Sequence, residues 1–320
     1  MKTGYPCINN SISRNAPSTF RLAFYSENRL VQTIQDNLIH LKQILQYNVK
    51  NNLLFFRISS DLIPFASHPI CGLDWGRHFQ SVFEQLGEFI KKYNIRISMH
   101  HDQFVVLSSP TGKVVESSIN ELKYHCKVLD AMGLDDTAKV QIHVGGVYGN
   151  KVKAINRFIR TFNDSGRFID NAIRRRLVIE NDDHLYNLKD CLRINQQTGI
   201  PIVFDSFHHE LYSNHEPLRI ALQEAMLTWN RNRDGIPIVD YSSQNNANGK
   251  ETRGRKCKHA KKINLTSFKR FLQETQGLSF DIMLEIKDKE KSALKALEVL
   301  RRQINKAAIF DPRPIISPWT

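Results

Sequence analysis

Histidines and carboxylates recur in this sequence where short apolar stretches end. In PIVFDSFHHE, residues 201–210, a proline and apolar residues lead into Asp205 and His208. A short apolar run opened by proline is typical of a buried strand. A single carboxylate at such an end is commonly a turn residue or a helix cap. Its recurrence at nearly every end instead favours a shared metal site, whose candidate ligands are His68, His100, His143, Glu180, Asp205, His208, Asp240, His259 and Glu285.

The chemistry of these ligands indicates which ions they would bind. Imidazoles and carboxylates without thiolates suit manganese, zinc or iron. The set is larger than one ion needs, so we expect two or three divalent ions, with a carboxylate such as Glu180 bridging a pair. Two ions roughly 3.5–4 Å apart can activate water, hold a phosphate and stabilise the leaving oxygen of an in-line displacement. In a basic protein, this combination points to phosphodiester hydrolysis.

The elements that must position these residues alternate along the chain. Eight stretches have strand character, and they span residues 3–9, 53–60, 95–101, 140–146, 176–182, 201–207, 236–243 and 280–287. Between them lie helical patterns, such as Ile34, Leu38, Leu41 and Leu45 on one face. Alternating strands and helices indicate parallel pairing, and eight such units predict a single α/β domain, a (β/α)8 TIM barrel with the metal site at the carboxyl ends of its strands. We expect one domain over 1–320, with the barrel at about 3–306 and a tail at 307–320.

The composition indicates the kind of binding partner and the cellular compartment. The chain has 45 basic and 32 acidic residues, a net charge of +13, which suits a polyanionic partner. Five scattered cysteines favour neither a disulfide framework nor a thiolate zinc site, and they indicate a reducing cytosol. No signal peptide opens the chain, and no apolar run approaches the roughly 18 residues of a membrane span. We therefore expect a cytoplasmic protein with no membrane contact.

Seven segments together resemble those of the UV damage endonucleases, and the resemblance runs from about residue 3 to residue 300. The segments are GYPCIN, FRISSDLIPFASH, HVGGVYGNK, LVIENDD, PIVFDSFHH, DYSSQ and DIMLEIKDKE. The resemblance implies a metal-dependent repair enzyme on a (β/α)8 barrel related to the apurinic endonucleases. It also implies incision of duplex DNA immediately 5′ of cyclobutane pyrimidine dimers or 6-4 photoproducts, leaving a 3′-hydroxyl and a 5′-phosphate.

The resemblance also implies roles for the candidate ligands. His68, His143 and Glu180 would hold one ion, and Glu180 would bridge to a second ion held by Asp205 and Glu285. His208, Asp240 and His259 would serve the remaining positions, and His100 opens a segment that in the family reads HPxQ. The catalytic residues would be Glu180, Asp205, Glu285 and His100, with Mn²⁺ preferred over Zn²⁺ or Mg²⁺.

The sequence departs from the family pattern at two places. The segment HHDQF carries His101 where the family has proline. On the seventh strand, many members carry lysine and histidine two residues apart, whereas Ile238 and Asp240 stand here. Asp240 can still ligate or position a metal, but Ile238 cannot, so metal preference is expected to differ from those members.

DNA recognition would need a second set of residues. Photoproducts stack and pair poorly, so flipping them out of the duplex costs less than flipping normal bases. By resemblance, Gln103 and Phe104 would form a wedge that probes the duplex, and Tyr5 would lie beside the flipped dinucleotide. Without the resemblance, a turn amide, a core phenylalanine and a rim tyrosine are the simpler interpretations.

Basic residues on the predicted active face are candidates for phosphate contacts. The segment 250–262 holds seven lysines and arginines and one acidic residue, which suits either a solvated loop or a phosphate-binding loop over the barrel mouth. We assign Arg255, Lys256 and Lys258 to the second interpretation. Lys151, after the fourth predicted strand, lies on the same face and is a further candidate.

Three alternatives stay open from the sequence. A general apurinic endonuclease would have the same fold and a metal site of the same kind. A metal-dependent sugar isomerase also places carboxylates and histidines at barrel strand ends, but it needs no basic loop and no net charge of +13. A catalytically silent DNA-binding relative should have lost ligands, whereas Glu180, Asp205 and Glu285 are all present. The expected partner is duplex DNA with UV lesions, bound by a monomer that associates with the nucleoid when acting and needs no obligate protein partner.

Overall fold

The computed structural model is a closed barrel of parallel strands, with residues 1–12, 18–101, 104–164, 169–243 and 258–310 described. Each strand pairs with the next, and β1 pairs with β8 to close the barrel. The strands are β1 (Thr3–Pro6), β2 (Phe55–Ile58), β3 (Arg96–His100), β4 (Lys139–His143), β5 (Leu177–Glu180), β6 (Ile202–Asp205), β7 (Ile238–Tyr241) and β8 (Asp281–Leu284). The predicted (β/α)8 barrel is therefore confirmed, and each strand lies within its predicted stretch except β4, which begins one residue earlier.

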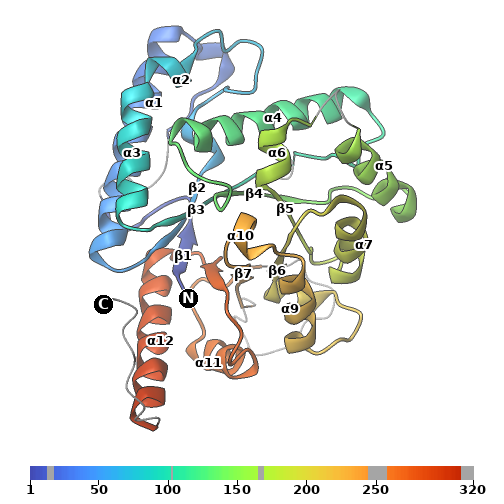
Figure 1. Ribbon diagram of the computed structural model, residues 1–320. Coiled ribbons are helices and arrows are strands. Elements are labelled where there is room, and N and C mark those ends of the chain that lie inside the picture. Colours follow the sequence, from blue (N-terminus) through green and yellow to red (C-terminus); the bar gives the residue numbers. More distant parts are fainter. Residues whose placement is uncertain (13–17, 102–103, 165–168, 244–257, 311–320) are drawn as a thin grey trace.

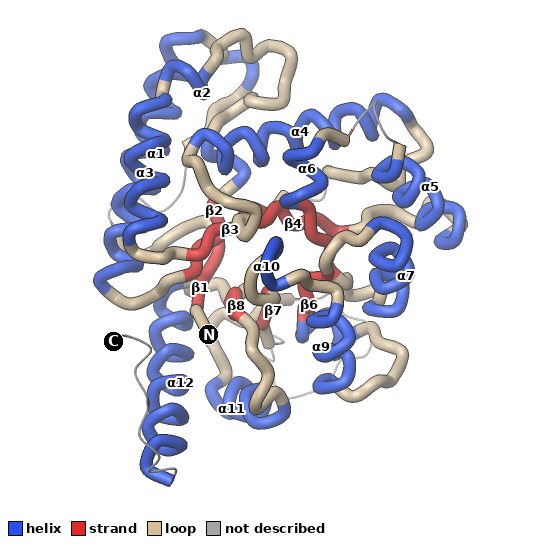
Figure 2. Tube along the Cα trace, viewed as in Figure 1, coloured by secondary structure: helices blue, strands red, loops and turns tan. Residues whose placement is uncertain are grey.

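Helices surround the strands on all sides (Figures 1 and 2). The α-helices are α1 (Glu27–Lys50), α2 (Trp75–His78), α3 (Gln80–Lys92), α4 (Gly112–Ala131), α5 (Lys151–Asn163), α6 (Asn171–Arg176), α7 (Leu188–Thr198), α8 (Ser206–Leu211), α9 (Leu218–Leu227), α10 (Arg231–Asp234), α11 (Leu265–Glu274) and α12 (Glu290–Phe310). Two short 3₁₀ turns, Leu22–Phe24 and Ser60–Leu62, precede α1 and follow β2. Helix α12 runs past the expected barrel end at residue 306, and residues 311–320 of the expected tail lie outside the described residues.

Helix α1 shows how the sequence places a helix against the barrel. It begins after Ser26, whose side chain accepts a hydrogen bond from the backbone N–H of Arg29 and so caps the first turn. The predicted apolar face is buried as expected, with Ile34, Leu38 and Leu45 at most 1% exposed. Burying a leucine of this kind contributes roughly 2 kcal/mol, so this face anchors the helix.

The barrel interior consists of layers, because side chains along a strand alternate in direction. One small core cluster contains Phe55, Val178, Val203, Ile238 and Met283, together with Trp229. Two residues after each of these five strand residues stands a charged residue. These are Arg57, Glu180, Asp205 and Asp240 on their strands and Glu285 directly after β8. An apolar layer therefore lies directly beneath a charged layer, and the charged layer occupies the carboxyl ends of the strands.

The amino ends of the strands carry buried ion pairs of their own. Arg96, the first residue of β3, places Nη1 2.8 Å from Oδ2 of Asp281, the first residue of β8. Lys139, the first residue of β4, places Nζ 2.6 Å from Oδ1 of Asp234. These four side chains are at most 5% exposed, so both ends of the barrel contain buried charge.

Two further observations concern membranes and cysteines. Among the described residues, no helix combines the length and the apolar character needed to cross a bilayer. The cysteines among the described residues, Cys7, Cys71, Cys126 and Cys191, are free thiols.

Candidate metal centre

Glu180, the last residue of β5, is the hub of the charged layer. Its Oε2 lies 3.2 Å from Nε2 of His100 and 3.8 Å from Nε2 of His143, while its Oε1 lies 3.1 Å from Nδ1 of His208. Glu180 is 1% exposed, so water cannot solvate its charge. A buried carboxylate surrounded by three imidazoles is a ligand arrangement suited to divalent ions.

Two groups of side chains around Glu180 could each hold an ion, and they share this carboxylate. His100, His143 and Glu180 place ligand atoms within 4.8 Å of one another, and so do Glu180, Asp205 and His208. The parallel barrel explains this, because β3, β4, β5 and β6 are consecutive neighbours and their last residues meet at one mouth. The structure thus brings five of the predicted ligands together.

Asp205 is held in place by the helix that follows it. Its Oδ1 accepts hydrogen bonds from the backbone N–H groups of Phe207 and His208, at 2.7 and 2.8 Å, and so caps α8. Its Oδ2 is buried, makes no hydrogen bond within the described chain and lies 3.4 Å from Nδ1 of His208. A buried carboxylate oxygen without a hydrogen bond is unusual, and it fits an ion at this position.

The protonation of the two central carboxyl groups supports the same conclusion. Burial alone raises the pKa of Glu180, but His143, His100 and His208 outweigh it and hold that pKa well below its usual range. Burial raises the pKa of Asp205 well above its usual range, with added repulsion from Glu180 and other carboxylates, although His208 opposes this. Both groups can ionise together when a cation lies between them, so this pair of carboxyl groups is consistent with a site for divalent ions.

Arg57 connects the remaining carboxylates of the layer. Its Nη2 donates to Oδ1 and Oδ2 of Asp240, at 2.9 and 2.8 Å, and its Nη1 donates to Oε1 of Glu285. Gln141 accepts from Arg57 at 2.8 Å and donates to Glu180 and Asp240, at 2.6 and 2.7 Å. The structure therefore places Asp240 as the partner of a guanidinium and outside the two ligand groups, and its role as a ligand stays a prediction.

Arg57 and Gln141 were not predicted, although the sequence carries a signal for them. Arg57 stands in the middle of the apolar stretch LLFFRISS, and a charged side chain in a strand covered on its outer face by helices must point into the barrel. Gln141 stands two residues before His143 on β4, so alternation directs it to the same interior. Applying the two-residue period to every strand would have identified both.

Glu285 and His259 lie together at the edge of the site. Nε2 of His259 is 3.7 Å from Oε2 of Glu285, and the His259 ring centroid is 6.2 Å from that of His208. Nδ1 of His259 is buried and makes no hydrogen bond to the described residues. These two side chains border the Glu180–Asp205–His208 group and are candidates for a further ion.

The role of His68 as a ligand stays a prediction. His68 is exposed on the segment after the second 3₁₀ turn, where its Nδ1 accepts a hydrogen bond from the backbone N–H of Ile70 at 3.1 Å. It belongs to neither ligand group around Glu180.

Tyr5 is buried in this structure, and its expected contact with a flipped dinucleotide stays a prediction. Tyr5 is 0% exposed, its hydroxyl donates to Asn48 at 2.6 Å and accepts from Asn9 at 2.7 Å, and its ring packs edge-on against Phe56. It is a core residue because α1 covers β1 and supplies Asn48 as a partner for the hydroxyl.

The other residues that were predicted to contact DNA differ in their exposure and in their partners. Phe104 is 84% exposed, which is unusual for a phenylalanine, and Lys258 is exposed. Lys151 begins α5 and is already paired, with Nζ 2.8 Å from Asp190 and 3.0 Å from the hydroxyl of Tyr212. Gln103, Arg255 and Lys256 lie outside the described residues.

Comparisons with known proteins agree with this architecture. The UV-endonuclease UvdE family model matches residues 1–311. A UV DNA damage endonuclease of Clostridium perfringens is 37% identical over 309 residues, which cover 96% of this chain and 72% of that protein. The crystal structure of SacUVDE has a TM-score of 0.86 at 44% identity and covers 95% of this chain and 99% of its own.

A more distant structure shows the fold alone. Endonuclease IV from Thermus thermophilus has a TM-score of 0.54 at 16% identity, over 82% of this chain and 94% of that one. The family match covers nearly the whole chain, including every residue of the candidate centre. This protein belongs to the UV-endonuclease UvdE family.

Proposed function

We propose that this protein is a DNA repair endonuclease that incises duplex DNA immediately 5′ of cyclobutane pyrimidine dimers and 6-4 photoproducts. The reaction is a metal-dependent phosphodiester hydrolysis that leaves a 3′-hydroxyl and a 5′-phosphate. Family membership supports an endonuclease acting on UV damage. The observation that carries the proposal is the buried Glu180 carboxylate, which is shared by two ligand groups at the barrel mouth.

Two ions fit the ligand groups around Glu180, and a third fits beside Glu285 and His259. One would be held by His100, His143 and Glu180, and another by Glu180, Asp205 and His208. Divalent ions, when bound, polarise the scissile phosphodiester and stabilise the leaving oxygen. The imidazole and carboxylate ligands suit Mn²⁺, with Zn²⁺ or Mg²⁺ as alternatives.

The chain's own residues orient these ligands. Gln141 and Arg57 bind Glu180, Asp240 and Glu285 from beneath, so the carboxylates keep their positions before any ion or substrate arrives. The α8 backbone does the same for Asp205. Preorganised ligands reduce the cost of assembling the transition state, so this layer contributes to rate as well as to structure.

We assign lesion recognition to residues at the rim of the barrel mouth. Phe104 projects from the segment after β3 with 84% of its surface exposed, and with Gln103 it would enter the stack and fill the space left by a flipped photoproduct. Phe104→Ala should weaken binding to a dimer-containing duplex by about tenfold, since stacking on an aromatic ring contributes roughly 1–3 kcal/mol. Binding to undamaged duplex should change much less, and an equal loss on both would contradict the wedge.

The net charge of +13 and the basic segment 250–262 support duplex DNA as the partner. Arg255, Lys256 and Lys258 would contact phosphates there, while Lys151 would need to release Asp190 to do so. We propose that the protein acts on DNA in the cytoplasm as a monomer without an obligate protein partner.

A nicking assay on one labelled duplex tests this function. The duplex carries a single thymine dimer, and matched undamaged and abasic duplexes are run with Mn²⁺ and with chelator. The expected result is a metal-dependent cut 5′ of the dimer that leaves a 3′-hydroxyl. Cutting confined to the abasic duplex would identify an apurinic endonuclease instead, and no cutting of any duplex would contradict the proposal.

A further inference from the structure

A second histidine–carboxylate cluster lies on the outer side of the barrel, and it shares no residue with the ligand groups around Glu180. His101, Glu121 and His125 place ligand atoms within 4.8 Å of one another. Glu121 and His125 stand one turn apart on α4, so they lie on the same helix face. His101 follows the last residue of β3, and alternation turns it away from the barrel interior that His100 faces.

The two imidazoles of this cluster are buried against each other. His101 is 6% exposed and His125 is 0% exposed, and their ring centroids lie 4.1 Å apart. The Nε2 atom of each ring is buried and makes no hydrogen bond within the described part of the chain. Buried polar atoms are nearly always hydrogen-bonded, so each of these two Nε2 atoms is open to a partner from outside the described chain.

The hydrogen bonding of His125 prepares it to be a metal ligand. Its Nδ1 lies 2.9 Å from the backbone carbonyl oxygen of Glu121 and donates to it, which leaves the lone pair on Nε2. A carbonyl that orients a histidine in this way is common behind metal ligands. This tautomer, with its proton on Nδ1, is the form that binds metal through Nε2.

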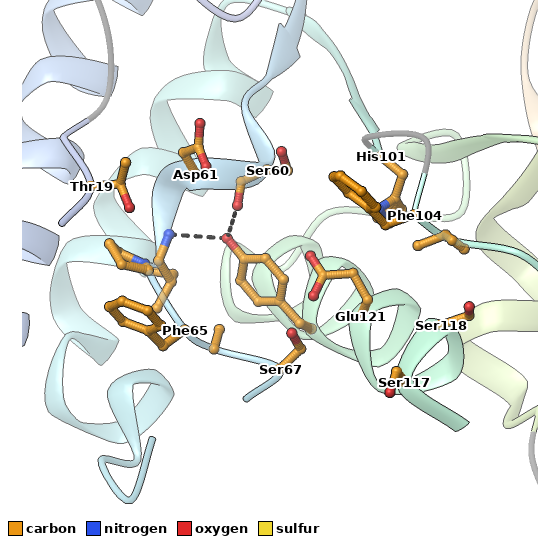
Figure 3. A pocket seen from close by; sticks show the side chains of 15 residues that line it. Thr19, Ser60, Asp61, Phe65, Ser67, His101, Phe104, Ser117, Ser118 and Glu121 are labelled. Atoms are coloured by element: carbon orange, nitrogen blue, oxygen red, sulfur yellow. Dashed lines mark hydrogen bonds between the residues drawn. The ribbon is translucent and has the colours of Figure 1, made fainter. Parts of the chain in front are cut away.

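A pocket leads from solvent to this cluster. It has a volume of about 310 Å³, and its lining includes His101, Phe104, Glu121 and Tyr124. Figure 3 shows His101, Phe104 and Glu121 close together along one wall of the pocket. The Glu121 side chain is 27% exposed, and its Oε1 lies 3.9 Å from Nδ1 of His125, so an ion could enter beside this carboxylate.

We propose that His101, Glu121 and His125 bind one Zn²⁺-class cation, with water as the fourth ligand. Two imidazoles, a carboxylate and a water form a ligand set typical of tetrahedral zinc. The ion would join the residue next to His100 to α4, so it would position the segment that carries Phe104. It would have no part in bond cleavage.

Cobalt titration of the full-length, metal-stripped protein tests this, because tetrahedral Co²⁺ absorbs visibly and its binding can be counted without any nicking assay. The wild type is compared with His101→Asn and with His78→Asn, a control at an exposed histidine of α2. We expect His101→Asn to bind one Co²⁺ fewer than the wild type and His78→Asn to bind the same number. The same comparison can be made in a Glu180→Gln background. The visible absorption band of Co²⁺ at this cluster should persist in Glu180→Gln, and only the added His101→Asn change should remove it.

A second variant tests the site if His101→Asn does not fold by circular dichroism. Glu121→Gln removes a ligand charge at a partly exposed position, and it should weaken Co²⁺ binding at this cluster by at least about tenfold. The matched control is Glu116→Gln, an exposed position of the same helix. Equal Co²⁺ number and affinity in the wild type, His101→Asn and Glu121→Gln would overturn the proposal and leave a water molecule as the partner of the two imidazoles.

Discussion

The two ends of the barrel both bury charge, but they balance it differently. At the amino ends of the strands, Arg96 pairs with Asp281 and Lys139 pairs with Asp234, so positive and negative charges match. At the carboxyl ends, the carboxylates are Glu180, Asp205, Asp240 and Glu285, and Arg57 is the guanidinium that meets two of them. The first end pairs each buried carboxylate with a basic side chain, whereas the second has more carboxylates than basic side chains. We therefore expect changes at the amino ends to affect stability and changes at the carboxyl ends to affect the proposed incision.

Glu180→Gln should have the largest effect of any change at the carboxyl end. It keeps the shape of the side chain but removes the charge that two ions would share, so incision of a dimer-containing duplex should fall by roughly a thousandfold or more. The nicking assay measures the loss, and circular dichroism checks that the variant is folded. Appreciable incision by a folded variant would show that Glu180 does not hold the ions.

Asp234→Asn makes the corresponding change at the amino end, and its effect should fall on stability alone. The change leaves the Lys139 ammonium buried without its counter-ion, which should cost about 3 kcal/mol of unfolding free energy. Urea denaturation measures this cost, and incision per folded molecule should be unchanged. Asp74→Asn is the control, because the Asp74–Lys127 pair is exposed and should contribute less than about 1 kcal/mol. Equal losses in the two variants would remove the distinction between buried and surface pairs.

Arg57→Lys should separate the positioning role of Arg57 from its charge. Lysine keeps the positive charge but cannot donate to Asp240 and Glu285 in two directions, so incision should fall by about tenfold while the protein stays folded. Metal affinity measured by titration should fall with it, because Glu285 loses its fixed orientation. Unchanged incision would mean that the charge alone suffices.

The pH dependence of stability should be the smallest effect, and it belongs to the amino end. Burial alone raises the pKa of Asp234, but Arg233 and Lys139 outweigh it and place the pKa below its usual value of 3.8. A carboxylate with a lowered folded-state pKa stabilises the protein above pH 3.8, and this contribution is lost as the pH falls toward the folded-state pKa. Urea denaturation at pH 5 and at lower pH should therefore show a steeper loss for the wild type than for Asp234→Asn. Parallel curves would exclude Asp234 as the source.

The parts of this molecule that were predictable from sequence are those governed by periodicity. Strand alternation and parallel pairing are enough to bring His100, His143, Glu180 and Asp205 to one mouth, because each ends a strand and neighbouring strands end together. His208 follows from the capping of α8 by Asp205.

The surroundings of His68 and Tyr5 in the structure could not be predicted from strand periodicity. His68 lies on an irregular connection whose path depends on tertiary packing, and strand alternation does not extend to it. Tyr5 stands on β1, but its burial depends on Asn48, which approaches from a helix 43 residues away. Asp240 was assigned from its residue type and its place at a strand end, and its pairing with Arg57 depends on which side chains share one layer.

The closure of the barrel has a consequence for synthesis. Strand β1 spans residues Thr3–Pro6, yet one of its two neighbours is β8, whose residues Ile282 and Met283 pair with Thr3 and Gly4. A chain emerging from the ribosome therefore cannot complete its sheet until β8, nearly 280 residues after β1, has been made. Until then β1 and the newest strand present open edges, which invite pairing with other chains. Translation that stops before β8 should yield fragments that aggregate or are degraded, because a fragment without β8 cannot form the closed barrel.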